Sequence, residues 1–295
     1  MHPEPPESIP TRGGFVVPRH DVPVADEILT NPRAERVKAV RALSGQSVRR
    51  RAGRFVVEGP QAVREAVLAA DVHDVYVTDA SAGRYPEIVE AAHERGIRVH
   101  TGTVEVLDAM SPDAQQVVAV ASLLAHTLAD LAGARLVAVL AHVRDPGNAG
   151  TVIRAADAAG ADAAVLTAES VDVHNPKVVR STAGSLFHLP VVTGTDLRST
   201  VEALRAAGLT VLAADGAGEH DLDDLLDVAG GAPDGLPDLA RPTAWVFGNE
   251  AWGLSDEDRL LADAVVRVPI RGRAESLNLA TAATVCLYAS ARAQR

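Results

Sequence analysis

Cysteine, aromatic residues and long apolar runs are all scarce in this chain of 295 residues. Its one cysteine, Cys286, can form neither an internal disulfide nor a thiolate metal cage, which favours a reducing compartment, the cytoplasm. No apolar run reaches the ~18 residues that a membrane-spanning helix needs. Residues 1–30 also lack the basic start and apolar core of a secretion signal. We therefore expect a soluble protein that is neither exported nor held in a membrane.

Aromatic residues make up only 3 % of the chain, although 47 % of its residues are hydrophobic. The cores must then be built from Ala, Val and Leu, a mixture typical of parallel sheets covered by helices. The length suits two domains, and the predicted class is α/β. We expect a disordered proline-rich arm over 1–28, a smaller α/β domain over 29–125, a linker over 126–134 and a second domain over 135–295.

Positive charge is concentrated in one segment, although the whole chain carries a net charge of −11. Residues 33–64 contain nine Lys or Arg residues and only two acidic ones. Within it, Arg49, Arg50, Arg51 and Arg54 are candidate RNA phosphate contacts, because we expect the Arg run to lie in a loop. The alternative is a solvated helix face. Residues 215–238 are strongly acidic, and we interpret them as a surface loop that faces away from RNA.

A candidate ligand site lies near the end of the chain, where two predicted strands stop at glycine-containing polar turns. A strand over 244–247 runs into Gly248-Asn249-Glu250, and a strand over 264–268 stops at Pro269. A last helix over about 280–292 follows, with Asn278 or Ser276 as its cap. In an α/β sheet, ligands bind at the carboxyl ends of strands, so these turns predict a binding site. The alternative is a pair of ordinary strand-to-helix loops.

A second candidate motif follows the predicted strand 136–140. Asn148 is a possible N-cap of a helix over 149–159, Gly160 is its natural C-terminal residue, and Arg154 lies within it. The turn lacks the G-x-G-x-x-G spacing and the phosphate-binding lysine, which disfavours a nucleotide-dependent oxidoreductase or an ATP site. Arg154 alone is equally consistent with an exposed helix residue. His174 and His188 have no metal-ligand spacing, so we expect no metal.

Three motifs together resemble those of a known family. NAGTVIRAADAAGAD (148–162), FGNEAWGLS (247–255) and VPIRGRAESLNLATA (268–282) are similar to motifs one, two and three of the SpoU/TrmH-type RNA 2′-O-ribose methyltransferases of the SPOUT superfamily. More loosely, RFVVEGPQAVREA (54–66) resembles the start of the family's substrate-recognition domain. The chain looks most similar to actinobacterial 23S rRNA methyltransferases, including thiostrepton-resistance-like enzymes. The departures are Ala251-Trp252 in a variable part of motif two, and Val268 where isoleucine is common.

The resemblance implies a C-terminal trefoil-knotted domain that binds S-adenosylmethionine, preceded by a smaller N-terminal α/β domain that recognises RNA. It assigns catalytic or active-site roles to Arg154, Asn148, Glu250, Ser276 and Asn278. It assigns cofactor binding to Ala214, Gly248, Asn249, Gly253, Val268, Pro269, Ile270 and Leu277. Because a guanidinium stays charged, Arg154 suits binding of the 2′-hydroxyl or of a phosphate better than removal of a proton.

The implied activity is methylation of a ribose 2′-hydroxyl, with 23S rRNA favoured as the substrate. A tRNA 2′-O-methyltransferase and a non-catalytic RNA-binding or ribosome-assembly protein stay open as alternatives. We also expect a homodimer, because the last helix (279–291) is apolar or small nearly all round and needs cover on more than one side.

Overall fold

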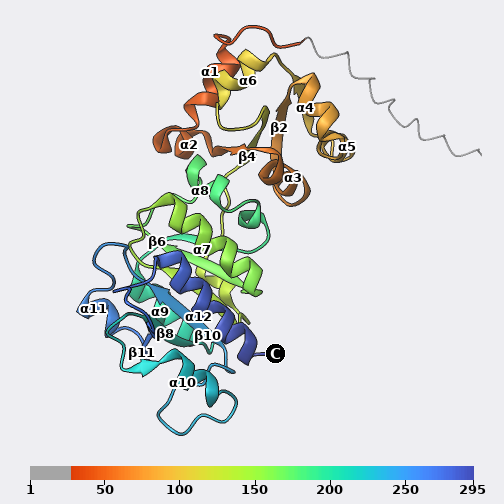
Figure 1. Cartoon of the computed structure of the whole chain (residues 1–295). Coiled ribbons are helices and arrows are strands. Elements are labelled where there is room, and N and C mark those ends of the chain that lie inside the picture. The colour runs from red at the N-terminus through yellow and green to blue at the C-terminus, as the bar shows by residue number, and fades with distance from the viewer. Residues whose placement is uncertain (1–27) are drawn as a thin grey trace, which may run out of the picture.

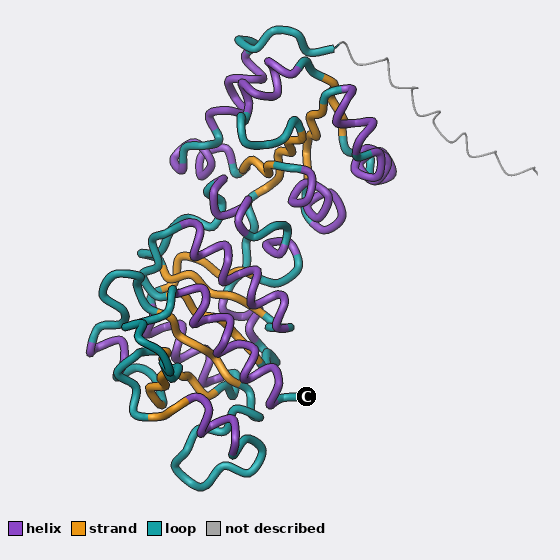
Figure 2. Tube along the Cα trace, viewed as in Figure 1, coloured by secondary structure: helices purple, strands orange, loops and turns teal. Residues whose placement is uncertain are grey.

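The computed structural model describes residues 28–295, which form two α/β parts arranged one above the other (Figure 1). The proline-rich arm predicted over 1–28 falls, except for Ile28, outside the described residues. Figure 2 shows that the strands form two separate sheets, each with helices packed against it. The four-stranded sheet belongs to the first part and the seven-stranded sheet to the second.

The first part is built on a mixed sheet in the order β1-β4-β2-β3. Its strands are β1 (Arg54–Glu58), β2 (Val72–Val77), β3 (Arg98–Thr101) and β4 (Val117–Ser122). Its helices are α1 (Glu35–Ala42), α2 (Gln46–Ala52), α3 (Pro60–Ala69), α4 (Asp79–Arg84), α5 (Pro86–Glu94) and α6 (Val104–Met110). Neighbouring residues in β1 face opposite ways: Val56 packs with α1 and α6, whereas Phe55 and Val57 pack with α3. Both faces of this sheet are therefore covered.

The second part is built on an all-parallel sheet in the order β7-β6-β5-β10-β8-β11-β9. Its strands are β5 (Leu136–Leu140), β6 (Ala163–Thr167), β7 (Val191–Thr195), β8 (Thr210–Ala214), β9 (His220–Asp221), β10 (Thr243–Phe247) and β11 (Ala264–Arg267). Its α-helices are α7 (Pro146–Ala159), α8 (Pro176–Ser181), α9 (Leu197–Ala206), α10 (Leu222–Asp227), α11 (Asp256–Arg259) and α12 (Leu279–Ala293). The central strands β5 and β10 are buried throughout, as parallel strands covered on both faces must be.

Helices α7 and α12 lie side by side over one face of this sheet, as Figure 1 shows. The indole of Trp245 in β10 points into this layer and donates a hydrogen bond to Ser290 Oγ of α12 at 2.9 Å. On the opposite face, α9 buries Val201 and Leu204 against β5, β8 and β10. The last helix is thus part of the core of the second part.

The structure corrects several sequence-based expectations. The Arg49–Arg51 run lies in helix α2 and not in a loop. The acidic segment 215–238 includes β9 and α10, because Leu222 and Leu225 bury an apolar side that a charge count does not reveal. The expected linker contains a short 3₁₀ helix, Leu128–Leu131.

Candidate functional site

A cavity of about 730 Å³ opens at the carboxyl ends of three neighbouring strands, β8, β10 and β11. The turn that leads into α12 closes its remaining side. All eight predicted cofactor residues line it, and so do Glu250 and Ser276, which the resemblance assigns to the active site. The eight are Ala214, Gly248, Asn249, Gly253, Val268, Pro269, Ile270 and Leu277. Positions far apart in the sequence therefore meet in one cavity, as expected for strand ends of a parallel sheet.

The turn after β10 has a conformation that requires glycine. Asn249 and Gly253 exchange two backbone hydrogen bonds of 2.9 Å each, which folds the turn back on itself. A Cβ on Gly248 would lie 2.6 Å from the backbone nitrogen of Leu254, too close for any side chain. The buried side chain of Asn249 fixes the turn, since it donates to the carbonyl of His142 at 2.8 Å and accepts from the Ala251 N–H at 2.8 Å.

A row of polar side chains joins the three motifs. Asn278 Nδ2 donates to Asn148 Oδ1 at 3.1 Å, and Asn148 Nδ2 donates to Glu250 Oε1 at 3.4 Å. Glu250 also accepts backbone N–H groups from Arg144 at 3.3 Å and from Asp145 at 3.0 Å. The predicted residues Asn148, Glu250 and Asn278 are thus held together, beside the main cavity.

Of the two predicted helix caps, the structure confirms the one for α12 and contradicts the one for α7. Asn278 caps α12, as predicted, by accepting from the backbone N–H of Ala280 at 2.9 Å. The N-cap of α7 is Asp145, which accepts from the Asn148 N–H at 2.7 Å, so the prediction that Asn148 is the cap is wrong. Because α7 starts at Pro146, the Asn148 side chain is left free to join the polar row.

Arg154 lies apart from this row. It is exposed on α7 and does not line the cavity, and its guanidinium has no hydrogen bond or ion pair among residues 28–295. It belongs to a face formed by the exposed residues of two adjoining helices, which we call the α7–α12 face. This face consists of Thr151, Arg154, Ala158, Thr281, Val285 and Tyr288. The Tyr288 hydroxyl donates to the Ala158 carbonyl at 3.2 Å and ties the two helices together.

Several residues of the site were missed at the sequence level. Asp215 and Arg259 line the cavity and form an ion pair of 3.1 Å, and Asp221 lines it as well. Asp215 follows β8 directly, so its position at a strand end was the available signal. The acidic segment therefore borders the cavity with Asp215 and Asp221, whereas the expectation that it faces away from RNA stays a prediction.

The predicted RNA-binding arginines divide into two kinds. Arg50, Arg51 and Arg54 are exposed, whereas the Arg49 side chain is buried and paired with Asp172 of the second part at 2.6 Å. Arg49 also donates to the carbonyls of residues 43 and 44. The prediction of Arg49 as an RNA contact is therefore wrong, because its guanidinium is occupied within the protein.

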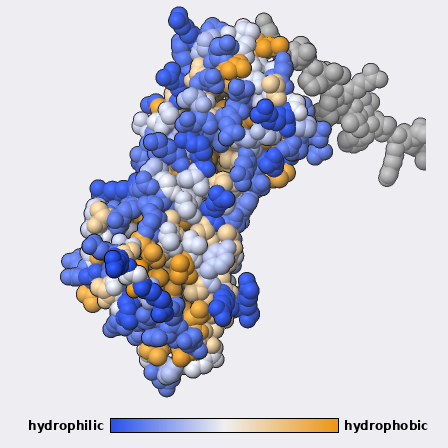
Figure 3. Space-filling view, viewed as in Figure 1, coloured by the Kyte–Doolittle hydropathy of each residue, from blue (hydrophilic) through white to orange (hydrophobic). Residues whose placement is uncertain are grey.

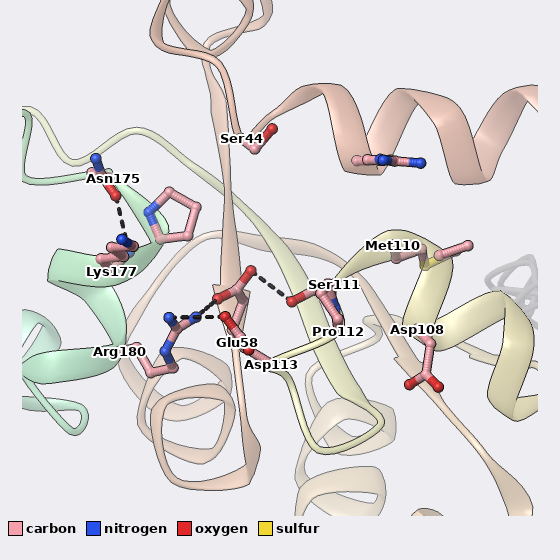
Figure 4. A pocket seen from close by; sticks show the side chains of 13 residues that line it. Ser44, Glu58, Asp108, Met110, Ser111, Pro112, Asp113, Asn175, Lys177 and Arg180 are labelled. Carbon is pink, nitrogen blue, oxygen red and sulfur yellow. Dashed lines mark hydrogen bonds and ion pairs between the residues drawn. The ribbon is translucent and has the colours of Figure 1, made fainter.

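A smaller cavity of about 430 Å³ lies where the two parts meet (Figure 4). Arg180 of α8 reaches across it to the carboxylates of Glu58 and Asp113, and Ser111 donates to Glu58 at 2.7 Å. Elsewhere at the junction, His188 bridges Glu65 of α3 and Asp157 of α7 at 3.2 and 2.8 Å. The hydrogen bond that the His188 imidazole donates to the Asp157 carboxylate, and to a smaller extent the one it donates to Glu65, raises the pKa of His188. Together with Arg49–Asp172, these contacts fix the first part against the second.

Neither a metal-binding cluster nor a membrane-spanning helix occurs among residues 28–295. Residues 28–295 contain no group of three or more His, Cys, Asp or Glu side chains that could hold a metal ion. Over the same residues, every helix is too short or too polar to cross a bilayer.

Comparisons with known proteins agree with the arrangement of the motifs. A family model described as the SpoU rRNA Methylase family matches residues 135–288, and a model for RNA 2′-O ribose methyltransferase substrate binding matches 56–126. The 23S rRNA (guanosine(2553)-2′-O)-methyltransferase RlmP of Bacillus subtilis is 33% identical over 88% of this chain and 97% of its own length. A 23S rRNA (uridine(2479)-2′-O)-methyltransferase of Streptomyces viridochromogenes is 42% identical, but over only 50% of this chain and 49% of its own.

Solved structures give the same result. An AdoMet-bound rRNA methyltransferase from Sinorhizobium meliloti has a TM-score of 0.75 at 30% identity and covers 90% of this chain and 97% of that chain. The SpoU methyltransferase AviRb from Streptomyces viridochromogenes, in complex with AdoMet, has a TM-score of 0.74 at 31% identity and covers 88% and 98%. The resemblance predicted from the three motifs is confirmed, and the chain belongs to the SpoU rRNA methylase family.

Proposed function

We propose that this protein transfers a methyl group from S-adenosylmethionine to a ribose 2′-hydroxyl of 23S rRNA. The observation that carries the proposal is the meeting of all eight predicted cofactor residues around one cavity at the ends of β8, β10 and β11. The relatives from Bacillus and Streptomyces are both named as 23S rRNA 2′-O-methyltransferases, which supports the choice of RNA. An rRNA substrate, together with a single cysteine, favours action in the cytoplasm.

The cavity suits the methyl donor in size and in chemistry. Its volume falls within the range of small-molecule sites, and Gly248 allows the turn that borders it to pack closely, since a Cβ there would collide with the backbone of Gly253 and Leu254. When bound, S-adenosylmethionine supplies an activated methyl group on a sulfonium, so the reaction needs no metal. Asp215 and Asp221 line the cavity but are paired with Arg259 and Arg267. Glu250 forms no ion pair among residues 28–295, so its carboxylate can attract a cationic ligand.

The chain's own residues would act on the ribose. The polar row of Asn278, Asn148 and Glu250 offers amide and carboxylate groups fixed by hydrogen bonds before the substrate arrives. Arg154 would hold the 2′-oxygen or a neighbouring phosphate and stabilise negative charge as the hydroxyl loses its proton. We assign no general base.

We also propose the trefoil knot that the family resemblance implies. The position of β10 supports it, because β10 lies between β5 and β8, two strands that precede it in the sequence. The chain therefore returns to the middle of the sheet after β8, an order that is compatible with the knot.

A homodimer through the α7–α12 face is the third part of the proposal. Val285 and Tyr288 leave 40% and 48% of their surface exposed on this face, and both are large apolar residues. Figure 3 shows orange and tan residues gathered over the second part of the molecule, on the side where α7 and α12 lie. Burial of this face in a two-fold dimer would also enclose Arg154, which a single chain leaves in solvent.

The dimer is tested by Tyr288→Arg, with Leu68→Arg as a matched control on the first part, where Leu68 is 58% exposed. Sedimentation at micromolar concentration should give a dimer for the wild type and the control, and a monomer for Tyr288→Arg. A wild-type monomer with full methyltransferase activity would contradict the dimer.

The activity is tested by incubating the full chain with methyl-labelled S-adenosylmethionine and an unmethylated 23S rRNA transcript. We expect label in the RNA at a linkage that resists alkaline cleavage, which marks a 2′-O-methyl group. Label in tRNA alone would favour the tRNA alternative. Tight RNA binding without transfer to either RNA would favour the non-catalytic alternative.

A further inference from the structure

Trp252 is an exposed indole at the rim of the cofactor cavity. It lines that cavity, yet 57% of its surface remains in solvent. The other tryptophan, Trp245, is fully buried, so the exposure of Trp252 is not a general property of aromatic residues here. A large aromatic side chain held in water at a binding site indicates a contact for a ligand or partner.

The structure fixes this indole in place. Trp252 lies in the turn that Asn249 and Gly253 close with paired backbone hydrogen bonds. The guanidinium of Arg144, from the turn before α7, lies over the ring at 5.4 Å from its centroid. Glu250 accepts the backbone N–H of Arg144, and so links the two turns. The ring and the guanidinium are therefore pre-organised as a pair.

Arg144 is exposed, and within residues 28–295 its guanidinium pairs with no carboxylate. One side of the indole thus carries a cation available to an anion, and the exposure of Trp252 leaves other parts of the ring accessible. An unpaired RNA base fits this pair chemically, because it stacks on an aromatic or guanidinium plane while its phosphate meets the charge.

We propose that Trp252 and Arg144 form a stacking platform for an unpaired base of the RNA substrate, beside the ribose that is methylated. The proposal rests on the proposed function, and adds that an unpaired base of the RNA substrate binds at the rim of the cavity. The base stacks on the exposed indole, and Arg144 braces the ring and attracts the adjacent phosphate.

Fluorescence gives a test that does not depend on turnover. The Trp245 indole is buried against Ser290, so acrylamide can reach only Trp252. Saturating amounts of an unmethylated 23S rRNA transcript, with binding verified by filter retention, should protect Trp252 from acrylamide. The Trp252→Phe variant, which retains only Trp245, should show no such change. Unchanged quenching in the RNA-bound wild type would overturn the platform.

Kinetics gives a second test. With Trp252→Ala we expect the KM for the transcript to rise about tenfold to hundredfold, while the Kd for S-adenosylmethionine stays within about twofold. Trp252→Phe should restore most of the RNA affinity and Trp252→Leu should not, because only the former retains a stacking face. Arg144→Gln should weaken binding less and make it less dependent on salt.

The outcomes separate this proposal from the proposed function. An active Trp252→Ala enzyme with a normal KM for RNA would remove the platform and leave the function intact. An equal loss of cofactor affinity would assign Trp252 to the cofactor and likewise overturn the proposal. A wild-type enzyme that binds the transcript without methylating any RNA would remove the function, while acrylamide quenching still tests the stacking.

Discussion

Arg49 and Asp172 lie 123 residues apart in the sequence and form an ion pair of 2.6 Å between Nη2 and Oδ2. Burial alone would raise the pKa of Asp172, but hydrogen bonds from His174 and Arg49 outweigh it and hold this pKa well below its usual value. Asp172 therefore stays charged, and the pair joins α2 to the loop after β6. It is one of four ion pairs between the two parts within residues 28–295, the others being Arg180–Glu58, Arg180–Asp113 and His188–Glu65.

Arg49→Ala should lower the free energy of unfolding by about 3 kcal/mol, because it leaves Asp172 partly buried without its counter-charge. Arg50→Ala is the matched control on the same helix, and its exposed side chain should change stability by less than about 0.5 kcal/mol. Urea unfolding of both variants measures the difference. Equal stability of the two variants would show that the pair is not a structural contact.

Replacement of Arg50, Arg51 and Arg54 by Ala should weaken RNA binding and flatten its dependence on salt. If each arginine neutralises one phosphate, the slope of log Kd against log salt should fall by about 2. Lys38→Ala is the control, since Lys38 is paired with Glu35 on the neighbouring helix. An unchanged slope in the triple variant would show that these arginines do not contact RNA and only form a solvated surface.

Gly248→Ala should weaken S-adenosylmethionine binding at least about tenfold, because the new methyl group collides with the backbone of the turn after β10. Gly216→Ala is the control: it lines the same cavity, and an added Cβ there has nothing within 4 Å. Calorimetric titration with the cofactor compares the two variants. Normal affinity in Gly248→Ala would mean that the turn does not shape the site.

Arg154→Lys keeps the charge but loses the planar fork of the guanidinium, so methyl transfer should fall by about 100-fold. The Kd for S-adenosylmethionine should stay within about twofold, because Arg154 does not line the cavity. Arg198→Lys, at an exposed position on α9, is the control and should keep full activity. Near-normal turnover in the Arg154 variant would exclude a catalytic role.

Local patterns explain why much of the site was predictable. The apolar runs of β5 and β10 and the cap residues Gly160 and Asn278 are short-range signals, and the structure confirms each of them. The eight residues predicted to bind the cofactor came from the family resemblance, and they meet because parallel strands end at one edge of the sheet.

Long-range contacts explain what the sequence could not reveal. Nothing near Arg49 indicates that its partner is Asp172, so a charge count assigned it to RNA. Asn148 was wrongly predicted as the N-cap of α7. Asp145, three residues earlier, is an equally suitable cap, and the local sequence does not distinguish the two. Asn148 instead contacts Glu250 and Asn278, which lie more than 100 residues away and become neighbours only in the folded sheet.

The placement of α12 against the central strands has a consequence for synthesis on the ribosome. The first sheet is complete once β4 has emerged, because all four of its strands lie between residues 54 and 122. Strand β5 follows soon after, but its partner β10 and its cover α12 lie more than 100 residues further along the chain. The first part can therefore fold as a unit during translation, while the buried strands of the second wait until α12 has been made. The second core closes only when α12 packs against β5 and β10.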